Sequence, residues 1–196
     1  MWPLLLLSVL GVTVALWRWM ALRTATQNVA PFMRALRGKL LANDIEGAIA
    51  VCNDYPSPVA TIVKSGLLRH GRAKDEIERS LQDASAHELA ALERGLPVLA
   101  TIAMIAPLLG FLGTVTGMIN SFEALAAVGL NNPAAVASGI SEALITTAAG
   151  LIIAIPVQMA YNYFVARVNA TIRDMEAAAN AVLDAFSDIE AGRSVA

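Results

Sequence analysis

One acidic side chain stands alone in a long apolar part of this sequence. Residues 124–166 contain a single Asp, Glu, Lys or Arg, which is Glu142. A carboxylate in hydrocarbon costs about 2.5–3.5 kcal/mol on insertion scales, so such residues face a protein interior or a wet cavity and mark ion or proton paths. A carboxyl group there can hold and release a proton. The alternative is an interfacial Glu142 outside the membrane, because residues 144–164 alone are long enough to span it.

Four threonine hydroxyls are candidates for the same chemistry. Thr146 and Thr147 follow Glu142 by four and five residues, and Thr114 and Thr116 lie midway along another apolar segment. A hydroxyl both donates and accepts hydrogen bonds, so it can hold a water molecule or pass a proton. The alternative is a hydroxyl that bonds its own helix or a neighbouring helix. We favour this alternative for Thr116, whereas composition leaves Thr114 and Thr147 open.

Small residues recur every three or four positions in the two segments that hold these groups. Such stripes let membrane helices approach closely, because packing rather than hydrophobicity holds helices together in lipid. Pro107 and Pro156 are expected to kink these helices or to free part of their backbone. The glycines predicted to pack the two helices are Gly110, Gly113, Gly117, Gly139 and Gly150.

The sequence carries no signature of catalysis. His70 and His87 show no metal-ligand spacing, and no P-loop, GxSxG or HExxH motif occurs. The apolar segments contain no Ser/His or Asp/Asp pair, which argues against an intramembrane protease. A lone cysteine, Cys52, excludes an intramolecular disulfide framework. We therefore expect no enzyme, no metal and no cofactor.

Charge is distributed very unevenly along the 196 residues. Only 15% of them are charged and 57% are hydrophobic, whereas a typical soluble domain is about 25% charged. Residues 1–17 and 95–122 carry no Asp, Glu, Lys or Arg at all, and the rest of the chain outside 124–166 has soluble-like charge. This pattern excludes a compact soluble globule, a disordered chain and a nucleic-acid binder driven by basic charge. It indicates a multi-span membrane protein.

Three segments approach the roughly 20 apolar residues that a membrane helix needs. Residues 96–119 meet that length, residues 133–164 exceed it, and residues 2–17 are short but end in a group of tryptophan and arginine residues that suits the interface. A cleaved signal peptide is the competing interpretation of residues 2–17. It fits poorly, because no basic region precedes the apolar core and no small-residue cleavage site follows it.

The basic residues indicate how the spans are oriented. Residues 18–94 hold 11 of the 14 Lys and Arg, the tail 167–196 holds the other three, and the connector 120–132 holds none. The positive-inside rule places the N-terminus outside and the C-terminus in the cytoplasm. The predicted parts are a first span (1–19), a cytoplasmic helical region (20–95), a channel core with two spans (96–166) and a cytoplasmic helical tail (167–196).

Helical periodicity continues outside the spans. Asn43-Asp44 is a plausible N-cap, and Tyr55-Pro56-Ser57-Pro58 should break the helix that follows it. From Lys74 the apolar stripe runs straight into the second span, so one continuous helix is expected there, with Pro97 near the membrane boundary. The tail after the third span is expected to extend its helix in the same way. The predicted fold class is an all-α integral membrane protein with long helices that extend into the cytoplasm.

Two long motifs carry a resemblance to a known family. The run APLLGFLGTVTGMI, from Ala106 to Ile119, resembles the second span of the MotA/TolQ/ExbB proton channel family, and GISEALITTAAGL, from Gly139 to Leu151, resembles its third span. Within that family the chain looks most like ExbB, with TolQ second. Thr116 departs from the pattern, because many members carry Trp at this position.

The resemblance implies a function and an assembly. It implies a homopentamer around a central pore in the bacterial inner membrane, with an ExbD-like single-span partner that bears an intramembrane Asp. Proton flow would drive this motor and energise TonB-dependent transport through a TonB-like protein. By motif, Glu142 matches the pore glutamate, and Thr147 and Thr114 match the two threonines of the proton pathway. TolQ-like service, or a passive membrane scaffold without ion flow, are the alternatives.

Overall fold

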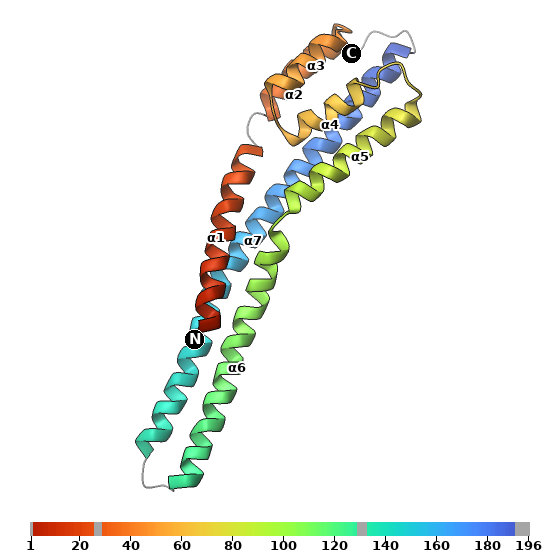
Figure 1. Cartoon of the computed structure of the whole chain (residues 1–196). Helices are drawn as coiled ribbons and strands as arrows, with labels where there is room; N and C mark the ends of the chain where they lie inside the picture. Colours follow the sequence, from red (N-terminus) through yellow and green to blue (C-terminus); the bar gives the residue numbers. More distant parts are fainter. Residues whose placement is uncertain (1, 26–28, 129–132, 191–196) are drawn as a thin grey trace. The chain divides into compact units, whose positions relative to one another are not determined.

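The computed structural model describes residues 2–25, 29–128 and 133–190. All of the secondary structure in this described part is helical, as the sequence predicts. Three helices are long and apolar enough to cross a membrane, and they fall within Trp2–Arg23, Lys74–Ala127 and Val136–Ile189. In chain order the helices are α1 (Trp2–Ala25), α2 (Val29–Leu41), α3 (Ile45–Asp54), α4 (Pro58–Leu67), α5 (Lys74–Glu93), α6 (Leu96–Val128) and α7 (Pro133–Glu190) (Figure 1).

The first of two compact units contains the apolar helices. It comprises Met1–Arg18 and Gly95–Phe164, and in it α6 and α7 lie side by side and run in opposite directions (Figure 1). Leu4 of α1 is buried with Ala106 of α6 and Ala154 of α7. Many large apolar side chains of this unit remain exposed, including Leu108, Phe111, Leu144 and Ile152. Such a surface suits lipid or other membrane helices rather than water.

The second unit comprises Trp19–Arg94 and Val165–Ala196. Its core holds fully buried side chains from α2, α4 and α7, among them Phe32, Ile62 and Val182. The predicted N-cap is confirmed, because the Asp44 carboxylate accepts a 2.8 Å hydrogen bond from the Gly47 N–H at the start of α3. The predicted break is confirmed as well, since α3 ends at Asp54 and α4 begins at Pro58 after its N-cap Ser57.

The expected continuous helix from residue 74 into the second span is wrong. α5 ends at Glu93 and α6 begins at Leu96, with Gly95 between them at a φ of +89°. Positive φ belongs to the left-handed region that glycine enters without steric cost, and it cannot continue a right-handed helix. Hydrophobic periodicity does not reveal such a break, because it reports which face of a helix is apolar and not whether the backbone is continuous.

The expectation for the tail is confirmed. α7 runs without interruption from Pro133 to Glu190, so the third apolar helix and the tail are one helix. Pro156 lies inside it, just as Pro107 lies inside α6. Each proline removes one backbone donor from its helix, yet neither of them ends it. α6 also extends past the apolar run to Val128, so much of the predicted connector 120–132 is helical, and residues 129–132 lie outside the described part.

Candidate functional site

Glu142 lies well inside α7 and not at its end. Nine residues of α7 precede it, which is about 14 Å of helix, and none of them is charged. The next residue, Ala143, packs against Gly117 of α6, and Gly139 packs against Ser121, so Glu142 is flanked on both sides by contacts between the two helices. Its own side chain is exposed in the single chain. The carboxyl therefore stands beside the α6–α7 contact and faces away from this chain.

The predicted packing glycines lie where α6 and α7 are in close contact. We call this contact the α6–α7 seam; it comprises Gly110, Gly113 and Gly117 of α6 with Gly139, Ala143, Thr146, Thr147 and Gly150 of α7. A Cβ added to Gly150 would lie 2.6 Å from the Ala106 carbonyl oxygen, and one added to Gly110 would lie 3.0 Å from the Thr147 Cα. Because these neighbours are backbone atoms, they cannot rotate aside. Larger residues would force the two helices apart.

The threonines near Glu142 differ in what their hydroxyls bond. Thr147 Oγ1 donates to the Gly110 carbonyl oxygen of α6 at 2.9 Å, across the seam. The other three donate to carbonyls of their own helices: Thr146 to Ala143 at 2.6 Å, Thr114 to Phe111 at 2.6 Å, and Thr116 to Leu112 at 3.0 Å. The interpretation favoured for Thr116, a bond to its own helix, agrees with this geometry. Of the four, Thr147 alone ties one helix to another.

The described residues offer no place for a metal. They contain no group of three or more His, Cys, Asp or Glu side chains close enough to hold an ion. The shifted titratable groups outside the spans belong to the second unit. The Lys39 ammonium and the Gly47 N–H hold the pKa of Asp44 below its ordinary value, and burial raises the pKa of the Cys52 thiol to about 11. Neither group is arranged for catalysis.

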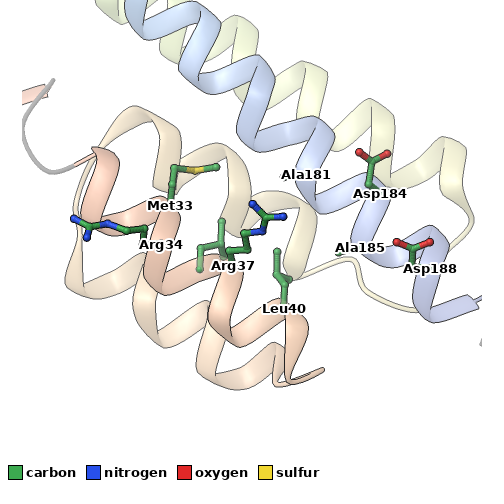
Figure 2. A pocket seen from close by; sticks show the side chains of 9 residues that line it. Met33, Arg34, Arg37, Leu40, Ala181, Asp184, Ala185 and Asp188 are labelled. Atoms are coloured by element: carbon green, nitrogen blue, oxygen red, sulfur yellow. The ribbon is translucent and has the colours of Figure 1, made fainter. Parts of the chain in front are cut away.

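A groove in the second unit was not anticipated from the sequence. It has a volume of about 560 Å³ and runs between α2 and the last turns of α7. Arg34 and Arg37 lie on the α2 wall, and Asp184 and Asp188 lie on the α7 wall (Figure 2). Among the described residues, no ion pair joins the two walls. The spacings of three and four residues place each pair on one helix face, which was the available signal, but the sequence does not show that the faces meet.

Comparison with known proteins now identifies the family. The sequence model of the MotA/TolQ/ExbB proton channel family matches residues 55–177, which include α6, Glu142 and the whole seam. The chain belongs to this family. Its members are proton channels, and no enzyme family is indicated. The family and the three apolar helices together make this chain a membrane protein.

Individual relatives of the family carry two different names. An ExbB homolog of Methanothermobacter thermautotrophicus is 38% identical over 130 residues, covering 66% of this chain and 46% of the relative. The Tol-Pal system protein TolQ of Pseudomonas aeruginosa is 40% identical over 125 residues, covering 58% and 54%. The biopolymer transport protein ExbB of Xanthomonas campestris pv. campestris is 29% identical over 187 residues, covering 85% and 74%.

The relatives differ from this chain in length and from one another in name. The chain spans about half the length of the first two relatives. Because the relatives are named both ExbB and TolQ at similar identity, the family is shown and the branch is not distinguished.

Proposed function

We propose that this chain is the proton-conducting subunit of an ExbB-type motor in the bacterial inner membrane, and that Glu142 carries the proton. The observation that supports this most directly is the position of Glu142. It is the single Asp, Glu, Lys or Arg of residues 124–166, it lies well inside the helix, and it falls within the segment matched by the proton channel family. In this proposal the motor uses the proton gradient to energise TonB-dependent transport across the outer membrane.

The exposure of Glu142 supports an assembly of several chains. A carboxyl group that faces hydrocarbon costs about 2.5–3.5 kcal/mol, so its exposed side must meet protein or water in the membrane. Three helices cannot enclose a water path by themselves. We therefore propose a ring of identical subunits, a pentamer by resemblance to the family, around an ExbD-like single-span partner with an intramembrane aspartate. Thr114 and Thr147 are proposed beside this path.

The energetics are sufficient for a motor. Each proton that crosses 100 mV releases about 2.3 kcal/mol. A ring of carboxyl groups that bind and release protons in turn can therefore move a partner helix stepwise, with a few kcal/mol of free energy available for each step. The mechanical output would pass to a TonB-like protein.

TolQ-like service is the second candidate, because a TolQ at 45% identity over 96 residues is also similar. The two services share the proposed proton chemistry and differ in the partner that receives the force. A gene for a TonB-like or a TolA-like protein next to this one separates them.

The first prediction concerns proton flux through Glu142. The chain is reconstituted into vesicles with its single-span partner, and proton entry is followed with a pH-sensitive dye under an imposed potential. We expect Glu142→Gln to lower the flux by at least about 100-fold, the scale of general acid–base contributions, because the amide cannot carry a proton. The assembled complex should keep its mass and yield.

Glu123→Gln is the matched control for this experiment. Glu123 is also an exposed glutamate of the first unit, near the end of α6, so its loss changes the charge equally and should leave the flux unchanged. Full flux through Glu142→Gln would contradict the proposal. Combined with failed assembly of Gly113 and Gly117 variants, that result would instead favour a passive scaffold.

A further inference from the structure

We propose that Thr147 is a positioning residue for Glu142, and that it does not pass the proton itself. Its hydroxyl ties α7 to the Gly110 carbonyl of α6 and thereby fixes where the Glu142 carboxyl stands along and around α6. This inference rests on the proposed function, because it assigns a second residue to the same site. It differs from a placement of Thr147 in the proton pathway.

The first support is the commitment of the hydroxyl hydrogen. A threonine hydroxyl has one hydrogen to donate, and Thr147 Oγ1 donates it to the Gly110 carbonyl oxygen at 2.9 Å. A backbone carbonyl can accept that hydrogen bond but has no proton of its own to pass onward. For Thr147 to relay a proton, the bond between the helices would have to break in every cycle.

The second support is the location of this bond where the backbones of the two helices are in close contact. A Cβ added to Gly110 would lie 3.0 Å from the Thr147 Cα, and one added to Gly150 would lie 3.1 Å from the Gly110 Cα. The bond therefore joins two backbones that are already in contact. Small-residue packing lets the two helices approach closely, and a hydrogen bond to one particular carbonyl adds a specific tie at one register.

The third support is the rigid connection from Thr147 to Glu142. The two residues lie five positions apart on one continuous helix, which is about 7.5 Å along its axis. A shift of α7 at Thr147 therefore moves the Glu142 carboxyl by the same amount. Misplacement of a reacting group by about 1 Å can cost 100-fold in rate, so a fixed register matters for a group that must meet a partner's carboxyl.

An independent tether between the helices separates positioning from proton relay. Ser121 and Gly139 face each other across the α6–α7 contact, and a Cβ at Gly139 would lie 3.4 Å from the Ser121 Cβ. This is close to the Cβ–Cβ distance of about 3.5–4.5 Å that is usual in disulfides. Ser121→Cys with Gly139→Cys should therefore form a disulfide that holds the register without Thr147. The native Cys52 is buried in the second unit, so it does not compete.

Proton flux is measured for Thr147→Val, which keeps the shape and loses the donor, with and without the oxidised tether. We expect Thr147→Val to lower the flux by about 10-fold or more, and Thr147→Ser, which keeps the donor, to stay near the unmodified chain. The oxidised tether should restore the flux of Thr147→Val, and reduction should abolish this rescue. The tether in the otherwise unmodified chain is the matched control.

Two results would overturn the inference. One is normal flux in Thr147→Val. The other is a tethered Thr147→Val that stays inactive while the tethered control conducts, since the hydroxyl would then act on the proton itself.

A second readout is independent of conduction. The rate at which the cysteine pair oxidises should fall several-fold when Thr147→Val loosens the register, and an unchanged rate would count against positioning. If the unmodified chain does not conduct, the proposed function fails, and this oxidation rate still decides whether Thr147 holds the helices.

Discussion

At the scale of single residues, we assign proton binding and positioning to two different side chains of the site. Glu142 supplies a group that can gain and lose a proton, and it is exposed where another chain or water must meet it. Thr147 supplies a bond between two backbones next to it. Both roles come from polar side chains in an apolar segment, but they differ in whether the side chain faces outward or across the seam.

Cys52 leads to a prediction on reactivity. The thiolate is the reactive form of cysteine, and burial raises the pKa of Cys52 to about 11, so about one thiol in a thousand is ionised at pH 8. We expect iodoacetamide at pH 8 to leave Cys52 unmodified in the folded protein and to modify it fully in denaturant, as read by intact mass.

An exposed cysteine provides the comparison for this measurement. Ser187 is exposed near the end of α7, so Ser187→Cys should be alkylated within the time that leaves Cys52 intact. Equal rates at the two positions would show that the core around α3 opens readily.

At the scale of elements, the seam fixes how closely α6 and α7 approach. Gly110 and Gly150 face backbone atoms of the opposite helix, as Gly150 faces the Ala106 carbonyl. Gly38 of α2 is different, because a Cβ there would meet nothing within 4 Å. The same substitution should therefore have opposite effects at the two positions.

We expect Gly150→Ala to destabilise the protein by about 1–3 kcal/mol, as overpacking of a tight contact does. Gly38→Ala should stabilise it by about 0.5–1 kcal/mol, because alanine loses less backbone freedom than glycine in a helix. Thermal unfolding of both purified variants in the same detergent measures the difference. Shifts of the same sign in both would show that helix propensity, and not the seam, decides the outcome.

The elements were predictable to different degrees. The N-cap at Asp44, the break before Pro58 and the continuous tail follow from local residue preferences, which act over a few positions. The stop at Gly95 depends on one residue adopting positive φ, and glycine also occurs inside membrane helices.

Contacts between distant segments were harder to foresee. The sequence predicts that Gly110 and Gly150 pack helices together, but it does not show which carbonyl Thr147 meets. The groove between Arg34 and Asp184 was missed for the same reason, since it requires α2 and α7 to be neighbours.

At the scale of the whole molecule, the distribution of basic residues bears on the orientation in the membrane. Basic residues concentrate in 18–94 and are missing from the connector 120–132, so we propose that the connector lies outside and the C-terminus in the cytoplasm. We expect a fluorescent protein fused to the C-terminus to fluoresce in cells, and alkaline phosphatase inserted at Asn131 to be active.

The reciprocal fusions are the controls for orientation. Alkaline phosphatase at the C-terminus and the fluorescent protein at Asn131 should both be silent. The opposite pattern would contradict the proposed orientation, because it would place the C-terminus outside the cytoplasm.

The interruption at Gly95 also bears on how the chain is made. α5 carries many charged residues, whereas α6, which begins at Leu96, carries none before Glu123. A continuous helix can pass from an apolar to a charged segment, as α7 does, but its two parts then share one axis. Because the helix is interrupted at Gly95, α5 can pack against α4 while the residues that follow insert into the bilayer. One glycine thus separates the water-soluble helix from the apolar helix here, whereas in α7 both parts belong to one helix.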